Sequence, residues 1–429
     1  MIDPRTLRER PGDVREMLSR RGVEYDLDAL VGADAEWRRA ASAADAARQR
    51  RNELGRAVAA AKKSGADASA HIAEMRGAAD RLDALEAARR EAHGRYAALA
   101  MSLPNMVHES VPTGPDSGAN VVVREWGEAR PADGDHAQVL ERMGLVDIER
   151  AAKVSGARFY YLVGDMVLLG RALVSHALDL AAERGYTAIQ PPYMIRRDSM
   201  EGATVAEDLE EAIYGVEGED LCMIGTSEHA MAAMHSDEIL EGASLPVRYA
   251  GYSACFRKEA GAHGRDQKGI FRVHQFDKVE QFAFARPEES WAEHERMLGV
   301  AEEFYRGLGL PHRVVLLSSG DMGKVSAKTY DIEAWMASQR EYREAVSCSN
   351  CLDYQARRLR IRFRDKTSEA TRHVHTLNST LVATTRALVA IVEGCRASDG
   401  RIEVPRPLQR YVGKADIGGG GAAGARGPP

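Results

Sequence analysis

The chain has 429 residues, of which 44% are hydrophobic and 28% are charged. This length is too great for one ordinary hydrophobic core, so the sequence predicts two domains. The composition is that of a soluble globular protein. The formal net charge of −6 argues against a broadly basic nucleic-acid-binding protein, so any contact with RNA must rely on a local basic surface.

The cysteines and the N-terminal residues indicate the compartment. The five cysteines form no pattern of a disulfide framework, which suits a reducing environment: Cys222, Cys255, Cys348, Cys351 and Cys395. The first residues, MIDPRTLRERPGDV, are charged and lack the apolar segment of a signal peptide. No apolar run approaches the length of a membrane span. The sequence therefore predicts a cytoplasmic protein without a membrane partner.

A helical hairpin is predicted near the N-terminus, after a short helical lead-in over residues 1–26. Between residues 27 and 63 small apolar side chains recur at spacings of three and four, a turn follows over 63–67, and the same pattern continues to Leu103. Two long helices with a short turn form an antiparallel hairpin. Its outer positions carry basic side chains, which alone indicate a solvated surface because acids are interspersed among them: Arg48, Arg50, Arg56, Lys62, Lys63, Arg76 and Arg81.

Proline and glycine mark the boundaries of the remaining segments. Pro104 ends the second long helix, so we expect an N-terminal domain over 1–110 and a linker over 111–137. A second domain is predicted over 138–414, and it contains a helix near 165–184. The glycine-rich tail over 415–429 is predicted to be disordered.

The stretch FRKEAGAHGRDQKGIFRVHQFDKVE, residues 256–280, is predicted to form two strands joined by a long loop with glycines at 261, 264 and 269. Alternation places Arg272, Phe276 and Glu280 on one face. An arginine, an aromatic ring and a carboxylate suit a polyphosphate, a purine and an ammonium group. The simpler interpretation is a polar sheet edge with salt bridges.

Shorter motifs flank this stretch. Gly225-Thr226-Ser227-Glu228 precedes it and also has the form of a helix cap. After it come a helix near 288–308, a strand near 327–335 and the strand EAVSCSN over 344–350. Cys348 and Cys351 are spaced as in zinc sites, but a structural zinc needs four ligands and no second pair is present, so we expect no zinc.

Residues 256–280 closely resemble motif 2 of class II aminoacyl-tRNA synthetases, in the form found in seryl-tRNA synthetases. Four further segments are similar to that family in the same order. Residues 165–194 resemble motif 1, 225–228 the TSE loop, 344–350 the EVSSCSN strand, and about 375–405 motif 3. Motif 3 departs from the bacterial form at Ser379, Thr380 and Leu381, but the spacing from Asn378 to Arg386 is kept.

The resemblance implies an α+β fold, in which an antiparallel two-helix coiled-coil arm (about 27–103) precedes a class II catalytic domain built on an antiparallel β-sheet flanked by helices. It also implies ATP-dependent activation of L-serine to seryl-adenylate and transfer of serine to tRNA(Ser) and also to tRNA(Sec). The arm would bind the tRNA, and Mg²⁺ would bind together with ATP. Motif 1 would form a homodimer interface.

Site residues follow from the resemblance position by position. The resemblance implies that Arg257 contacts the α-phosphate and that Glu259 contacts the adenine amino group. It also implies that Arg272 and Arg386 contact the outer phosphates. The whole ATP set implied is Arg257, Lys258, Glu259, Arg272, Val273, Phe276, Glu344, Ala345, Val346, Ser347 and Arg386, with Glu344 and Ser347 as Mg²⁺ ligands. The serine set implied is Thr226, Ser227, Glu228, Arg257, Glu280, Asn378 and Thr380.

Two alternatives remain from the sequence. One is a relative that activates an amino acid for an acceptor other than tRNA, and such relatives usually lack the long arm that this chain keeps. The other is a catalytically inactive RNA-binding relative, which the loss of Arg257, Glu280 or Arg386 would have supported. All three residues are present.

Overall fold

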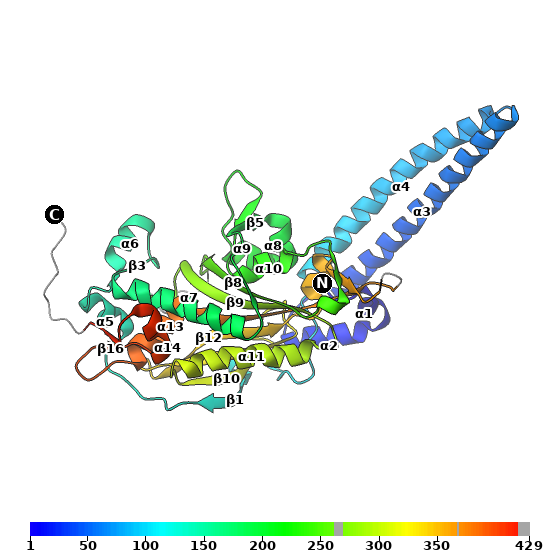
Figure 1. Ribbon diagram of the computed structural model, residues 1–429. Helices are drawn as coiled ribbons and strands as arrows, with labels where there is room; N and C mark the ends of the chain where they lie inside the picture. The colour runs from blue at the N-terminus through cyan, green and yellow to red at the C-terminus, as the bar shows by residue number, and fades with distance from the viewer. Residues whose placement is uncertain (261–268, 367–368, 419–429) are drawn as a thin grey trace. The chain divides into compact units, whose positions relative to one another are not determined.

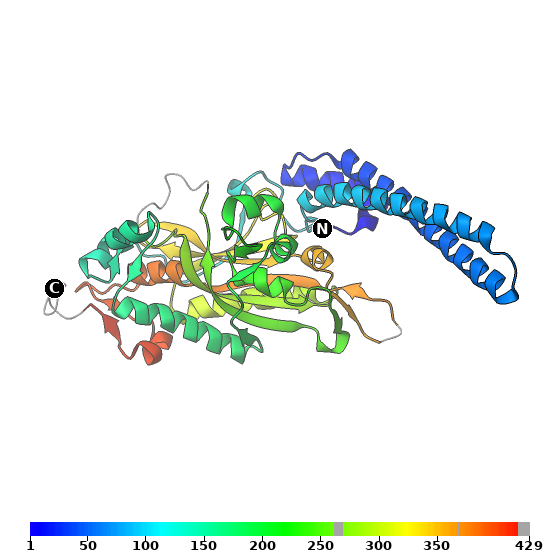
Figure 2. The ribbon, with the colours of Figure 1, turned by 90° about the horizontal axis from the view of Figure 1, so that it is seen from above.

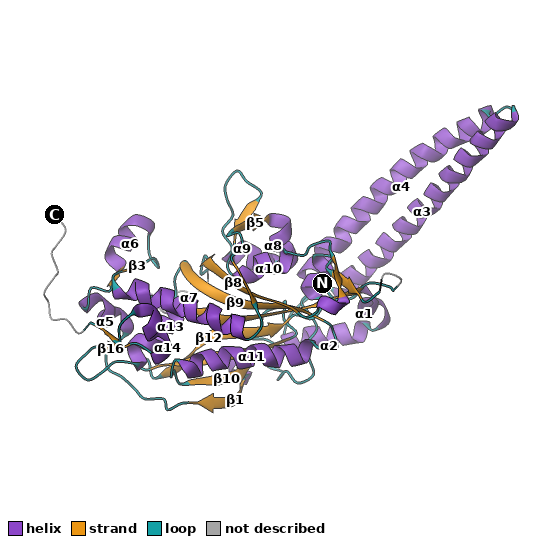
Figure 3. Ribbon diagram, in the orientation of Figure 1, coloured by secondary structure: helices purple, strands orange, loops and turns teal. Residues whose placement is uncertain are grey.

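The computed structural model describes residues 1–260, 269–366 and 369–418. The chain divides into two compact units. One comprises residues 2–19 and 23–103, and the other comprises residues 1, 20–22 and those from 104 onward. Figure 1 traces both units along the chain, and Figure 3 distinguishes their helices from their strands.

The first unit is helical and is dominated by a long hairpin (Figure 1). It contains α1 (Pro4–Glu9), most of α2 (Pro11–Arg21), α3 (Leu27–Ser64) and α4 (Ser69–Ser102). Helix α3 begins where Asp26 accepts a hydrogen bond from the Ala29 amide, and it ends at Gly65, whose φ of 71° favours glycine. Trp37 stacks on Tyr96 with ring centroids 5.0 Å apart, so aromatic packing joins the two helices. The predicted hairpin is confirmed.

Basic side chains of the hairpin fall into two groups. Arg48 forms an ion pair with Glu86, and Arg50 Nη2 lies 2.5 Å from Glu74 Oε1, so these arginines partly cross-link the two helices. Others are exposed, and the structure records no ion pair for them among the described residues: Arg56, Lys62, Lys63, Arg76 and Arg81. An exposed ion pair contributes little to stability, about 0–1 kcal/mol. The two paired arginines and the other five basic side chains therefore all remain available to a partner.

The second unit is built on an eight-stranded sheet with the order β1-β10-β11-β12-β15-β9-β8-β4. Its strands are β1 (Val121–Trp126), β4 (Thr187–Ile189), β8 (Val247–Phe256), β9 (Gln275–Ala285), β10 (His312–Leu316), β11 (Lys328–Met336), β12 (Glu341–Asn350) and β15 (His375–Ala383). Neighbours pair antiparallel except β4 and β8, which are parallel. The predicted α+β class with a mainly antiparallel sheet is confirmed.

Helices cover one face of this sheet. These are α7 (Asp165–Glu183), α11 (Ser290–Gly307) and α13 (Thr384–Gly394), which contact the central strands. Figure 2 shows α7 lying along the sheet. Leu173, Phe304 and Leu388 from these helices share one core with Val279 of β9. Because strand side chains alternate, the even-numbered residues of β9 from Phe276 to Glu280 face the opposite way and line a cavity.

Smaller elements complete the unit. They are α5 (His136–Arg142), β2 (Val146–Asp147), α6 (Ile148–Ser155), β3 (Tyr161–Leu162), β5 (Met194–Arg196), α8 (Arg197–Ala203), α9 (Ala206–Ala212), β6 (Leu221–Met223), α10 (Ser227–Ala233), β7 (Ile239–Glu241), α12 (Tyr354–Arg358), β13 (Arg362–Arg364), β14 (Arg372–His373), β16 (Ile402–Glu403), α14 (Arg406–Val412) and β17 (Asp416–Ile417). None of the helices in the described ranges combines the length and hydropathy that a bilayer crossing needs.

The predicted linker over 111–137 is wrong, because β1 lies within it and pairs antiparallel with β10 at the edge of the sheet. Val121, Val122 and Val123 are all largely exposed, so this strand lacks the alternation that identifies strands in a sequence. Its partner lies far away along the chain. The predicted start of the second domain at residue 138 is also late, since α5 begins at His136.

Two further boundaries differ from the prediction. Residues 104–110 belong to the second unit rather than to the first, because Asn105 and His108 form backbone hydrogen bonds with Lys324 and Ala327. At the other end, β17 pairs with β16 and Ile417 is buried, so the folded unit extends past residue 414. The rest of the predicted disordered tail, residues 419–429, lies outside the described residues.

The motif 2 strands are shorter than predicted. β8 ends at Phe256 and β9 begins at Gln275, so Arg257, Glu259 and Arg272 lie outside the sheet ladder. Glu259 has a φ of 50°, which ends the extended conformation. The alternation argument therefore applies to Phe276 and Glu280 but not to Arg272. Residues 261–268 of the connecting loop, including Gly261 and Gly264, lie outside the described residues.

Candidate active site

A cavity of about 450 Å³ opens on the face of the sheet opposite the core helices, and its wall is strongly polar. Such a volume suits a small-molecule ligand. Fourteen predicted site residues line it: Thr226, Glu228, Arg257, Glu259, Arg272, Val273, Phe276, Glu280, Glu344, Ala345, Ser347, Asn378, Thr380 and Arg386. They come from segments spread over more than 150 positions (386 − 226 = 160). The fold thus brings the separate motifs to one place.

Three predicted residues lie outside this wall. Ser227 is fully buried, and its hydroxyl donates to the Gly251 carbonyl at 3.0 Å, so it packs α10 onto β8. Lys258 Nζ donates to the Glu210 carbonyl at 3.0 Å, which directs it toward α9. Val346 packs in the core on the opposite face of β12. The geometry gives these side chains a structural role and no contact with the cavity.

Arg257 connects motif 2 to the loop that precedes α10. Its Nε donates to the Gly225 carbonyl at 3.0 Å, and its guanidinium lies 5.4 Å from the centre of the Phe276 ring. The Gly225 amide donates in turn to His229 Nδ1 at 3.3 Å. Burial lowers the pKa of His229 to about 3, so this imidazole is neutral and accepts that hydrogen bond. Thr226 caps α10 by accepting from the Glu228 amide at 3.2 Å.

Two carboxylates occupy the middle of the cavity. Burial, followed by the nearby Glu280 carboxylate, raises the pKa of Glu228 to about 7. Asn378 Nδ2 donates to Glu228 Oε1 at 3.0 Å. Glu280 forms an ion pair with Lys278 and accepts from the Thr380 hydroxyl at 3.2 Å. The Glu280 carboxylate disfavours the charge on Glu228, and a cation that enters beside these two groups would relieve this repulsion.

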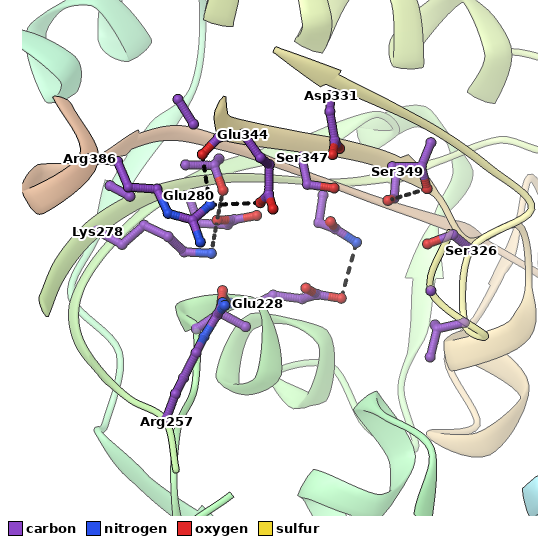
Figure 4. A pocket seen from close by; sticks show the side chains of 18 of the residues that line it. Glu228, Arg257, Lys278, Glu280, Ser326, Asp331, Glu344, Ser347, Ser349 and Arg386 are labelled. Atoms are coloured by element: carbon purple, nitrogen blue, oxygen red, sulfur yellow. Dashed lines mark hydrogen bonds and ion pairs between the residues drawn. The ribbon is translucent and has the colours of Figure 1, made fainter. Parts of the chain in front are cut away.

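Arginines form the other charged group, at the end of the cavity where Figure 4 shows Arg386 and Glu344. Arg386 Nη1 lies 2.8 Å from Glu344 Oε1 and also donates to the Glu344 carbonyl at 3.0 Å. Arg386 holds the pKa of Glu344 below its usual value. Arg272 similarly pairs with Glu259, at 3.1 Å. The two arginines predicted to hold the outer phosphates, Arg272 and Arg386, therefore each have a carboxylate partner that an anionic ligand would displace.

The residues at the predicted metal position suit a hard cation. Asp331 of β11 lies opposite Ser347 of β12 in the sheet register, and Figure 4 shows both beside Glu344. Asp331 Oδ1 is buried and accepts no hydrogen bond from the described residues. Burial, reinforced by Glu344, raises the pKa of Asp331 well above its usual value. Carboxylate and hydroxyl oxygens are the ligands that Mg²⁺ takes, so the donor set fits that ion.

The sequence missed several wall residues. Lys278 could have been found, because it alternates with Phe276 and Glu280 on the same strand face. Asp331 lies on a strand that the sequence predicts, but nothing local shows that this strand pairs with residues 344–350 and places Asp331 opposite Ser347. Cys351 also lines the cavity and accepts from Asn378 Nδ2 at 3.5 Å, whereas Cys348 Sγ donates to the His294 carbonyl at 3.8 Å.

Another part of the wall, Gly323–Ser326, is held from outside the cavity. Asn105 Nδ2 donates to the carbonyls of Val325 and Cys351, at 2.8 Å each. Arg21 Nη2 donates to the Ser326 carbonyl at 2.5 Å, and Arg21 Nε donates to the Asn105 carbonyl at 3.0 Å. Both side chains are buried. No local signal in the sequence pointed to this connection.

The antiparallel sheet and its polar cavity define a class II aminoacyl-tRNA synthetase. A model described as the tRNA synthetase class II core domain (G, H, P, S and T) matches residues 214–394. A prolyl-tRNA synthetase of Giardia lamblia, at 16% identity and a TM-score of 0.55, shares the fold over 63% of this chain and 54% of its own. This solved structure shows the shared fold, and the full-length relatives described next show that the chain is an enzyme of the ligase class that the sequence predicted.

Full-length comparisons narrow the class. The model of the seryl-tRNA synthetase N-terminal domain matches residues 1–107. A serine--tRNA ligase of Nitrosopumilus maritimus is 61% identical over 96% of this chain and 99% of its own length. The crystal structure of the seryl-tRNA synthetase from Pyrococcus horikoshii complexed with ATP is 45% identical, covers 97% of this chain and 99% of its own, and has a TM-score of 0.88. The chain belongs to the seryl-tRNA synthetase family, which confirms the resemblance.

Proposed function

We propose that this protein activates L-serine with ATP to form seryl-adenylate and transfers the serine to tRNA(Ser). The observation that carries the proposal is that one cavity is lined by two carboxylates and by arginines with an aromatic ring: Glu228, Glu280, Arg257, Arg386 and Phe276. Carboxylates suit the ammonium of an amino acid, and arginines with an aromatic ring suit a nucleoside triphosphate. The relative from P. horikoshii was solved with ATP, which supports ATP as the substrate.

The first step requires no acid–base pair, because the serine carboxylate is already a nucleophile. It attacks the α-phosphorus, and pyrophosphate leaves. Positioning and electrostatic stabilisation of the phosphorus transition state supply the rate enhancement. Arg257 would contact the α-phosphate while Phe276, which it already faces at 5.4 Å, stacks on adenine. The backbone of Val273 would lie beside the base. Glu259 would leave its ion pair with Arg272 and accept a hydrogen bond from the adenine amino group.

Arg272 and Arg386 would hold the outer phosphates. Each would exchange its present carboxylate partner, Glu259 or Glu344, for phosphate oxygens. Mg²⁺, when bound, neutralises charge that develops on the phosphates. Glu344 and Ser347 would hold it, with the unpaired oxygen of Asp331 facing the same place.

Glu228 and Glu280 would bind the serine ammonium with Thr226. Asn378 and Thr380 would complete the pocket around the hydroxyl. Thr380 already donates to Glu280, so this side chain fixes one carboxylate while its methyl group limits the space beside it. The side chains proposed around the serine are all polar, which favours a substrate that carries a hydroxyl group.

The hairpin of α3 and α4 would bind the tRNA through its exposed arginines and lysines, with tRNA(Ser) as the principal substrate and tRNA(Sec) as a second. We also propose a homodimer. Exposed apolar side chains on α7 of motif 1, Val167 and Leu168, support an interface there, since apolar surface of this kind commonly marks contacts between proteins.

The experiment is an aminoacylation assay with total tRNA and serine, threonine, alanine or cysteine, together with amino-acid-dependent ATP–pyrophosphate exchange. We expect exchange with serine and charging of tRNA with serine only. Exchange without charging would indicate a different acceptor. The absence of exchange with every amino acid would indicate an inactive RNA-binding relative.

A further inference from the structure

A buried amide contacts one of the two central carboxylates from behind the cavity wall. Gln355 lies on the short helix α12 and is completely buried. Its Nε2 donates to Glu228 Oε1 at 2.9 Å. It does not line the cavity, so it contacts a ligand there only indirectly, through the lining residues that it holds, Glu228 and Ala203.

The hydrogen bonds of Gln355 fix the orientation of its amide. Nε2 also donates to the Ala203 carbonyl at 2.9 Å, and Oε1 accepts from the Thr376 hydroxyl at 2.7 Å. A carbonyl oxygen can only accept, which assigns the nitrogen to the side facing Ala203 and Glu228. Both amide hydrogens and the amide oxygen are thereby used. Partners from α8 and β15 hold the group in one position.

The geometry has a consequence for the carboxylate. Gln355 and Asn378 both donate to Glu228 Oε1, so among the described residues these two amides leave Oε2 for a ligand in the cavity. Hydrogen bonds to a carboxylate favour its charged form. The anion that an ammonium group needs is thus both oriented and stabilised.

We propose that Gln355 is a positioning residue for serine recognition, holding Glu228 as an oriented carboxylate for the substrate ammonium. The inference rests on the proposed activation of serine and assigns to that reaction a residue outside the cavity wall. The anchoring of Gln355 by Thr376 and Ala203 makes the orientation of Glu228 a property of the packed fold rather than of a mobile side chain.

Removal of the amide donor has an effect that depends on pH. Burial raises the pKa of Glu228 to about 7, and the hydrogen bond from Gln355 opposes that rise. Without the donor, the pKa of Glu228 moves further up, and the carboxylate ionises only at higher pH. The charged and titratable groups around Glu228 are Glu280, Lys278, Arg257, His229 and Cys351, and all remain in place in a variant of Gln355.

The test uses the full chain and serine-dependent ATP–pyrophosphate exchange from pH 6 to 9. Gln355→Leu removes the donor at similar volume. We expect the KM for serine at pH 7 to rise about 10–100-fold, as for a lost hydrogen bond to a charged group, with the KM for ATP and kcat within about threefold. The KM for serine should fall at a higher pH than in the parent.

Two further variants separate positioning from packing. Thr376→Val leaves Gln355 in place but frees its oxygen, and it should give a smaller change of the same kind. It also tests the inference if Gln355→Leu does not fold. Arg358→Lys is the matched control, because Arg358 donates to the Thr204 and Glu201 carbonyls beside the same end of α8 without contacting Glu228. It should change thermal stability and leave the KM for serine unchanged.

The outcomes distinguish the inference from the function on which it rests. A folded Gln355→Leu variant with a parental KM for serine would overturn the inference, as would equal losses for serine and ATP without a pH shift. A parent enzyme that shows no serine-dependent exchange would refute the proposed function instead.

Discussion

At the scale of single residues, the cavity depends on charges that are paired in the structure and would exchange partners when substrates bind. Arg386 pairs with Glu344, and Lys278 pairs with Glu280. Such pairs keep buried charges satisfied before binding, since an unpaired buried charge is costly. Loss of one member of such a pair therefore removes a contact to the substrate and also leaves the other charge without its partner.

Arg257→Ala and Arg386→Ala should each abolish adenylate formation, with a loss of at least about 100-fold in pyrophosphate exchange, because each guanidinium is proposed to contact charge on the triphosphate. Arg150→Ala, which breaks an exposed pair with Asp147, is the control and should retain full activity. Exchange within a few-fold of the parent would refute both assignments.

Thr380 should control the rejection of threonine, which keeps the hydroxyl of serine and adds only a methyl group. In Thr380→Ser, activation of threonine relative to serine should rise by about 10–200-fold, the range for one methyl or methylene group in a pocket. Rejection of alanine should change little. Unchanged selectivity in exchange assays would assign the steric role to another residue.

Glu280→Gln should depress activation of serine itself, because it removes one of the two carboxylates expected at the ammonium and leaves Lys278 without its partner. The measurement is the KM for serine in pyrophosphate exchange, with the KM for ATP as the internal comparison. If Glu280→Gln activates serine normally, the carboxylate is not an anchor and the map of the pocket is incorrect.

The raised pKa of Glu228 predicts a pH dependence of substrate binding. The value of about 7 lies above the ordinary value of 4.5, so the side chain is protonated at pH 6 and ionised at pH 8. Only the ionised form attracts an ammonium group. The KM for serine should therefore fall between pH 6 and 8, and Glu228→Gln should abolish this dependence while raising the KM throughout. A pH-independent KM in the parent would contradict it.

At the scale of elements, the site depends on segments that support the sheet residues from outside. Asn105 follows α4 in the chain and holds the carbonyls of Val325 and Cys351. α12 provides Gln355 and Arg358, whose side chains donate to carbonyls at the C-terminal end of α8. Carbonyls at a helix C-terminus have no hydrogen-bond donor within the helix, so side chains from a distant segment supply the donors.

Asn105→Ala should destabilise the second unit. Two buried carbonyls would lose their donor, and each unsatisfied group costs about 1–3 kcal/mol, so we expect a decrease of about 2–6 kcal/mol in the free energy of unfolding. Urea denaturation measures this change. Asn52→Ala, at an exposed position on α3, should have almost no effect, and equal stability of both variants would show that the Asn105 contacts are unimportant.

At the scale of the whole molecule, the two units divide the proposed tasks between them. The hairpin of α3 and α4 has its own apolar seam, with Leu54, Val58 and Leu82 buried between the helices. The cavity is formed entirely by the other unit. Serine activation and tRNA binding should therefore be separable.

Deletion of the hairpin between Trp37 and Tyr96, which keeps the stacked pair at its base, should leave serine-dependent exchange within about threefold of the parent and reduce tRNA charging by at least about 100-fold. The hairpin is removed as a unit, so its loss exposes little of the remaining core. Full charging of tRNA by the shortened protein would assign the hairpin another partner.

Local sequence was sufficient for the hairpin, and the resemblance of short motifs to one family supplied fourteen of the 31 residues that line the cavity. The spacing of small apolar residues, with an αL glycine at the turn, follows from helix geometry alone. Arg257, Phe276, Glu280, Asn378 and Arg386 belong to short motifs whose resemblance to one family was clear from their order. These features depend on neighbours in the chain, which a sequence displays directly.

Tertiary structure alone decided the rest. The sequence predicts a linker where β1 lies, because the valines of this strand are exposed and its partner β10 lies far along the chain. Gln355 and Asn105 act through hydrogen bonds to segments more than 100 positions away (355 − 228 = 127 and 325 − 105 = 220). A polar residue that supports a site from behind carries no periodicity or motif of its own, because its role exists only where the folded chain brings its partner within hydrogen-bonding distance.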